Sequence, residues 1–147
     1  MVGDISIEVK QESDAPPTLL MGLVKNWHDL PEYWHGIREI RDVGGGMYSI
    51  RFAFPATGKM SYIWDQENMK CTENYHSGPF TGYKMLEFRQ WNGGTLMVAK
   101  WEIKLSLRML IMKGFIKRHF TEGTENALRR MALAAHKKME NLSPASP

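Results

Sequence analysis

The sequence predicts an α+β domain in which a seven-stranded antiparallel sheet wraps around one long C-terminal helix. From Ile37 to Leu105 apolar residues alternate with polar ones, and turn residues interrupt the alternation, as strands joined by hairpins require. From Leu105 to Asn141 the apolar period becomes helical. No segment between the strands is long enough for a crossover helix, so neighbouring strands are expected to pair antiparallel as a meander.

The chain begins with a predicted half-buried strand and a short helix. Asp4–Lys10 places its isoleucines and its valine on one face and its charged residues on the other. Ser13 or Asp14 offers an N-cap acceptor, and Pro16-Pro17 fits a first helical turn. Apolar residues at helical spacing then continue the helix to Trp27.

A second short helix is predicted directly after the first. Asp29 is placed to cap it, Pro31 lies in its first turn, and Glu32 could close a capping box. This helix is expected to end near Trp34.

Six further strands follow in the prediction, each separated from the next by turn residues. Glycines, Pro, Asn and Asp occupy the separating segments, as hairpins require. The predicted strands are Ile37–Val43, Met47–Phe54, Lys59–Trp64, Met69–Tyr75, Gly82–Trp91 and Thr95–Leu105.

The last predicted element is a single amphipathic helix running to about Asn141. Its expected apolar stripe comprises Met109, Met112, Ile116, Phe120, Gly123, Ala127, Met131 and Ala134. Gly114 and Gly123 each weaken a helix by about 1 kcal/mol relative to Ala, so a bend or a close approach is expected there.

Composition narrows the class of protein. The 147 residues suit one domain, predicted to span residues 1–142, with a disordered tail at 143–147. No apolar run reaches the length of a membrane span, and Cys71 is the single cysteine, so we expect a cytoplasmic location without a disulfide. Residues 107–142 carry a net charge of +5, which fits a solvated helix face or an anion-binding surface; we expect no nucleic-acid partner.

The side chains expected on the facing surfaces of sheet and helix differ in size. Large residues dominate the expected inner face of the sheet, whereas the helix stripe thins to glycine and alanine. Such a pairing either brings the helix close to the sheet or leaves a hollow, and the sequence alone permits both.

Three local features and the order of elements resemble a known superfamily. The features are Ala15-Pro16, the segment Leu30–Trp34, and Gly93-Gly94-Thr95 before the last strand. Over about residues 4–140 the chain resembles the START-like, Bet v 1-like superfamily (SRPBCC, polyketide cyclase and dehydrase). The resemblance implies a helix-grip fold with a ligand cavity between the sheet and the terminal helix. Its members range from lipid carriers to cyclases and hydrolase activators.

Binding of a small hydrophobic molecule, such as a lipid or a polyketide-like or aromatic compound, is therefore the predicted function. Apolar and aromatic side chains with a few polar groups are typical of such cavities. The residues predicted to line the cavity are Trp34, Phe52, Tyr62, Trp64, Tyr83, Trp101, Ile116 and Phe120.

Two alternatives stay open at this point. One is a cyclase or dehydratase in which Glu73, Glu87, His119 or Tyr62 transfers protons, because a carboxyl group in an apolar cavity acquires a raised pKa. The other is a protein-interaction domain with a filled core that uses the basic helix or the short helices. No cofactor is predicted. No metal site is predicted either, because Pro31 interrupts the helical register between His28 and His35.

Overall fold

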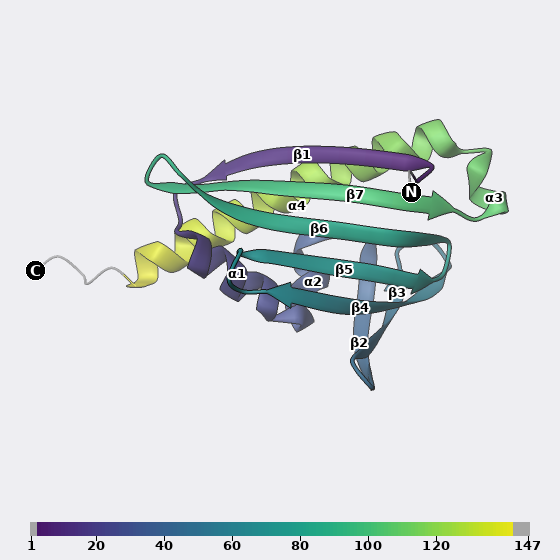
Figure 1. Ribbon diagram of the computed structural model, residues 1–147, viewed down its shortest axis with the longest axis horizontal. Coiled ribbons are helices and arrows are strands. Elements are labelled where there is room, and N and C mark those ends of the chain that lie inside the picture. The colour runs from purple at the N-terminus through teal and green to yellow at the C-terminus, as the bar shows by residue number, and fades with distance from the viewer. Residues whose placement is uncertain (1–2, 143–147) are drawn as a thin grey trace, which may run out of the picture.

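The computed structural model describes residues 3–142 and contains one seven-stranded antiparallel sheet with helices on one side of it (Figure 1). The strand order is β1-β7-β6-β5-β4-β3-β2, so six strands form a meander and β1 joins its far edge beside β7. The strands are β1 (Ile5–Ser13), β2 (Ile37–Gly44), β3 (Met47–Phe52), β4 (Thr57–Asp65), β5 (Lys70–Ser77), β6 (Phe80–Trp91) and β7 (Gly94–Leu105). The predicted fold class is confirmed.

The two edge strands lie at opposite ends of a curved sheet. β1 pairs with β7 along its whole length, from Ile5 opposite Ile103 to Ser13 opposite Thr95. The β2–β3 hairpin turns through Gly44, Gly45 and Gly46, which all have positive φ, a conformation that glycine adopts without strain. In Figure 1 this hairpin bends away from the plane of β6 and β7.

The segment between β1 and β2 forms short helices, as predicted, but their caps differ from the prediction. They are α1 (Pro17–Lys25), the 3-10 turn η1 (Trp27–Asp29) and α2 (Leu30–Tyr33). Neither α1 nor α2 has a side-chain cap. Ser13 accepts a bond from Ala15 N at 3.1 Å and Asp29 accepts one from Asn26, so both side chains are engaged in turns ahead of the helices.

The predicted long C-terminal helix is confirmed, but it begins at Lys113 rather than directly after Leu105, because a separate short helix precedes it. The chain forms α3 (Leu107–Leu110) and then α4 (Lys113–Leu142). Ser106 O accepts bonds from Met109 N and Leu110 N, which makes α3 an isolated turn leading out of β7. The break lies ahead of Gly114, and a Cβ atom at Gly114 or Gly123 would meet nothing within 4 Å, so neither glycine marks a close approach.

α4 crosses one face of the sheet and packs along β1 (Figure 1). Its fully buried residues are Ile116, Thr124, Ala127, Leu128, Met131 and Ala135. The buried stripe therefore differs from the predicted one: Met112 and Gly123 are exposed, and Ala134 is half-buried. A polar residue, Thr124, takes a buried place because its hydroxyl has partners there, as described below. The predicted disordered tail, 143–147, lies outside the described residues.

Candidate ligand-binding cavity

A cavity of about 340 Å³ separates the middle of α4 from the sheet. Three parts of the chain enclose it: the segment from Trp34 to Ile37, the end of β3, and α4 from His119 to Arg130. Strands β5, β6 and β7 supply its inner wall through Tyr75, Phe80, Lys84 and Trp101. The core is therefore not solidly packed between helix and sheet.

Aromatic rings form most of that inner wall. The ring centroids of Phe80 and Phe120 are 5.3 Å apart, and those of Trp101 and Phe120 are 5.1 Å apart, both edge-to-face. Trp34 approaches Trp101 at 6.0 Å, and Phe52 approaches Phe80 at 5.4 Å. Edge-to-face pairs add about 0.5–1.5 kcal/mol each beyond burial, so this wall is a rigid apolar surface.

Thr124 fixes the orientation of Trp101 in the wall. The indole Nε1 of Trp101 donates to Thr124 Oγ1 at 2.9 Å, and the Thr124 hydroxyl donates to Phe120 O at 2.7 Å. A buried indole N–H would otherwise lose a hydrogen bond. The polar residue on the buried face of α4 thus joins the helix to β7 beside the cavity.

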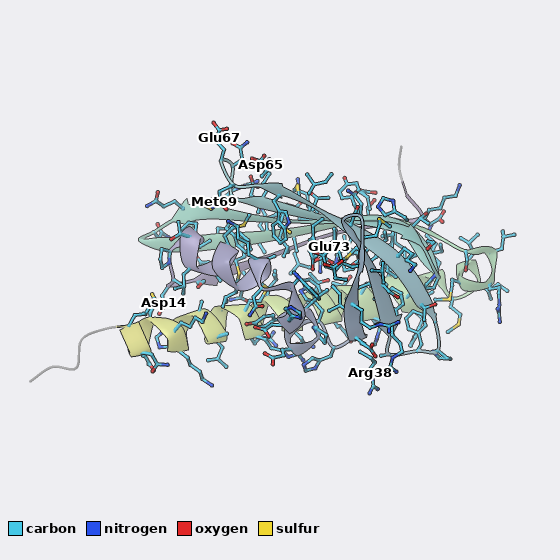
Figure 2. The ribbon with its side chains drawn as sticks, turned by 90° about the horizontal axis from the view of Figure 1, so that it is seen from below. Asp14, Arg38, Asp65, Glu67, Met69 and Glu73 are labelled. Atoms are coloured by element: carbon cyan, nitrogen blue, oxygen red, sulfur yellow. The ribbon has the colours of Figure 1, made fainter. Side chains whose placement is uncertain are left out.

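A buried ion pair adjoins the aromatic wall, and one of its members, Lys84, also lines the cavity. Lys84 Nζ on β6 is 2.9 Å from Glu73 Oε2 on β5, and both side chains are completely buried. The pair follows from strand register, because Glu73 and Lys84 are direct cross-strand partners. Figure 2 shows Glu73 in the interior, between the sheet and α4.

The Lys84 ammonium also contacts the cavity wall. Its Nζ lies 3.3 Å from the ring centroid of Trp34 and 5.4 Å from that of Trp101, which are cation–π distances. Burial lowers the pKa of Lys84, and the Glu73 carboxylate opposes that shift. The Lys84 ammonium therefore contacts the Trp34 and Trp101 rings of the cavity wall directly.

Buried hydroxyl and thiol groups complete this polar cluster. Tyr75 donates to Glu73 Oε1 at 2.6 Å. Burial, followed by the charge of Glu73, raises the pKa of Tyr75, Tyr62 and Cys71. The protonated forms of these three groups are therefore favoured.

The helix side of the cavity is polar, in contrast to the sheet side. His119, Gly123, Asn126 and Arg130 recur at three- and four-residue steps and form one stripe along α4, and Glu122 borders the stripe beside Gly123. Arg130 Nη1 donates to the carbonyl oxygen of Tyr33 at 2.8 Å, which joins α4 to α2. The cavity thus has an aromatic interior and a charged rim.

The structure brings together half of the predicted ligand-binding residues at the cavity. Trp34, Phe52, Trp101 and Phe120 line it. Of the other four, Tyr62 is mostly buried and stacks on Trp64, away from the cavity, while Ile116 packs in the core one turn before it. Trp64 and Tyr83 are each 38% exposed. Tyr83 points outward because it alternates with Lys84, and Trp64 lies at the end of β4.

Besides Tyr62, the predicted acid–base residues occupy different surroundings. His119 lines the cavity rim. Glu73 is buried behind Lys84 and does not line the cavity. Glu87 lies on the outer face of the sheet, where it contacts Lys70 at 3.6 Å and Arg89 at 2.7 Å. The strand alternation that turns Tyr83 outward turns Glu87 to the same face, where its ion pairs leave it half-buried.

Sequence reasoning missed Lys84 and Tyr75. The available signal was the phase of β6, in which Lys84 alternates with the buried Leu86 and Phe88. Because lysine is almost never fully buried unless paired, its partner Glu73 had to be known before this phase could be interpreted.

Neither a metal centre nor a membrane span emerges from the described residues. In residues 3–142, no three His, Cys, Asp or Glu side chains gather closely enough to hold a metal ion. Within the same range, no helix has the length and apolarity that crossing a bilayer requires.

Comparison with solved structures supports the fold. TTHA0849 from Thermus thermophilus superposes with a TM-score of 0.76 at 17% identity, over 90% of this chain and 98% of that one. A START superfamily protein from Mycobacterium smegmatis has a TM-score of 0.73 at 10% identity, over 88% and 97%. The Zhui aromatase/cyclase from Streptomyces sp. R1128 has a TM-score of 0.68 at 9% identity, over 91% and 94%.

Fold, cavity and solved relatives together define a START-like, helix-grip structure, and the predicted resemblance is confirmed at the level of fold. No protein-family model and no curated protein matches the sequence. At identities this low the likeness carries the fold alone, so the function must be argued from the cavity.

Proposed function

We propose that the protein binds a small, mainly aromatic or aliphatic ligand in the cavity between the sheet and α4. The observation that carries this proposal is a cavity of about 340 Å³ with an aromatic inner wall and a polar rim. Ligand sites are typically concave and mostly apolar, with a few polar groups that orient the ligand. A compound of two or three fused rings would fit a space of this size.

The distribution of polarity gives the ligand an orientation. Its apolar part lies against Phe80, Trp101 and Phe120, and its polar end lies toward Asn126 and Arg130 on α4. One Arg130 nitrogen donates to Tyr33, which leaves further guanidinium donors for an oxygen of the ligand. The proposed ligand class is therefore apolar compounds with an oxygen acceptor at one end.

Binding, rather than catalysis, is the function that the geometry favours. Glu73 is separated from the cavity by Lys84 and the wall rings, and Glu87 faces outward. His119 is the predicted acid–base residue at the cavity rim. The cyclase alternative therefore stays a prediction that rests on this residue. A cytoplasmic location also stays a prediction.

The proposal can be tested by blocking the cavity from α4. Gly123 lies in the middle of the polar stripe, and an added side chain there would meet no protein atom at its Cβ position. Gly123→Phe should fill much of the cavity without disturbing the core. Fluorene and 9-fluorenone are suitable three-ring probes, and their binding can be followed by quenching of tryptophan fluorescence, because Trp34 and Trp101 line the cavity.

We expect Gly123→Phe to weaken the binding of both probes at least about tenfold, since overpacked space excludes a ligand. Gly114→Phe is the matched control, because Gly114 is on the same helix, is equally unobstructed and does not line the cavity. Arg130→Met should reduce only the advantage of fluorenone over fluorene. The proposal fails if neither probe binds the wild-type protein, or if both glycine variants bind equally well.

A further inference from the structure

An exposed apolar surface occupies the end of the molecule opposite the C-terminal end of α4. It consists of α3, the turn that follows it and the first turn of α4, which project beyond the strands in Figure 1. Leu107 is 85% exposed and Ile111 is 91% exposed, so neither side chain packs against the rest of the domain. The other large apolar residues of this surface, which we call the α3 patch, are Leu110, Met112 and Phe115.

Basic residues flank the α3 patch without acidic neighbours in sequence. Between Glu102 and Glu122 the chain carries five Lys or Arg residues and no Asp or Glu. They are Lys104, Arg108, Lys113, Lys117 and Arg118, all of which are exposed. Among residues 3–142, none of these five has an ion-pair partner, and the nearby Asp4 carboxylate accepts the N–H of Leu105.

We propose that the α3 patch docks onto an anionic lipid membrane surface. Exposed aliphatic and aromatic side chains beside lysines and arginines are the combination that interfacial membrane helices use, because apolar groups enter the acyl boundary while cations meet lipid phosphates. Since no described helix could cross a bilayer, the contact is peripheral. This inference does not depend on the identity of the cavity ligand.

Charge distinguishes a membrane from a second copy of the chain. A symmetric dimer through the α3 patch would bring the same basic residues of two copies together, with no acidic residue of the segment to compensate them. An anionic surface instead complements all five cations at once. Phe115 also stacks on His119 of the cavity rim, at 6.0 Å between ring centroids, so the docked face adjoins the cavity.

Vesicle sedimentation tests the proposal with the full chain. Phosphatidylcholine vesicles are compared with vesicles that contain about 30% phosphatidylserine, because each nearby basic residue strengthens binding to anionic lipid. We expect the anionic vesicles to bind at least about tenfold more tightly, and 0.5 M NaCl should remove most of that difference.

Two pairs of variants separate the apolar and the electrostatic contributions. Ile111→Asp with Phe115→Asp should weaken vesicle binding at least about tenfold, whereas Leu133→Asp, an exposed leucine elsewhere on α4, should not. Arg108→Glu with Lys113→Glu should abolish the preference for anionic lipid, and Lys137→Glu with Lys138→Glu, which changes the net charge equally, should retain it. Circular dichroism verifies that each variant is folded.

Three results would overturn the proposal. The first is equal binding to both kinds of vesicle. The second is an equal loss of binding in the patch variants and in their matched controls. The third is a dimer in solution that dissociates when Ile111 and Phe115 are replaced, which would assign the patch to a second copy of the chain.

Discussion

The Glu73–Lys84 pair is the residue-scale feature that most constrains the cavity. Taking two charges out of water costs several kcal/mol per ion, and their attraction repays this only while both are present. Here Tyr75 donates to the carboxylate and Trp34 faces the ammonium, so the charges have polar and π partners within the core. The pair therefore specifies the position of the wall rings more than it adds stability.

Removing one charge of this pair should be far worse than removing both. Lys84→Met removes the cationic partner of the buried Glu73, and we expect it to lower the free energy of unfolding by about 3–5 kcal/mol. Glu73→Gln combined with Lys84→Met is uncharged and still offers Tyr75 an acceptor, so it should lose less than half as much. Urea unfolding followed by circular dichroism measures both values. Equal losses in the single and double variants would contradict this account.

The type of residue at each position decided which parts of the site could be predicted from the sequence. Trp34, Phe52, Trp101 and Phe120 follow from aromatic residues in phase with a buried strand or helix face, and all four line the cavity. Tyr83 and Glu87 share one phase of β6, and that phase faces outward. The inward orientation of the other phase of β6 was not predicted, because it includes Lys84 and a charged side chain normally indicates exposure.

At the scale of elements, His136 joins the C-terminal part of α4 to the β1–α1 connection. His136 Nδ1 lies 2.6 Å from Asp14 Oδ2, and His136 Nε2 lies 3.0 Å from Glu140 Oε1. The hydrogen bond and charge of Asp14 raise the pKa of His136 above its usual 6.5. In Figure 2 Asp14 lies beside this part of α4.

This contact predicts a pH dependence of stability with a defined sign. Because the folded pKa of His136 is raised, its stabilising contribution is complete below pH 6.5 and is lost as the pH rises through the folded pKa. His136→Gln should therefore lower the melting temperature more at pH 5.5 than at pH 8.5. His35→Gln is the control, because His35 is exposed and its Nε2 lies 3.1 Å from the Glu32 carbonyl oxygen rather than beside a carboxylate. A difference between wild type and His136→Gln that grows with pH would reverse the assignment.

Element order was more predictable than element detail, for a physical reason. Alternation and turn residues act locally, so the strands and the meander could be predicted from the sequence. The break between α3 and α4 falls at Ile111 and Met112, where the local sequence pattern stays helical and does not predict it. The same holds for Thr124, whose burial is explained only by the indole of Trp101 across the core.

At the scale of the whole molecule, three different features lie along α3 and α4. The middle of α4 borders the cavity, the α3 end carries exposed apolar and basic residues, and the far end contacts the β1–α1 connection. The cavity is an unfilled part of an otherwise packed core, and such space costs stability because its lining lacks contacts. A ligand that fills the cavity should supply the contacts that its lining residues lack and so stabilise the folded domain.

Ligand binding should therefore raise the thermal stability of the entire domain. A ligand at tenfold its dissociation constant stabilises the folded state by about 1.4 kcal/mol, which for a chain of this length corresponds to roughly 3–6 °C in melting temperature. We expect 9-fluorenone to produce this shift in the wild type and in Gly114→Phe, and little shift in Gly123→Phe, whose added ring occupies the cavity. Differential scanning calorimetry at several fluorenone concentrations measures the shift. If the melting temperature of Gly123→Phe rose as much as that of the wild type, the probe would be binding outside the cavity.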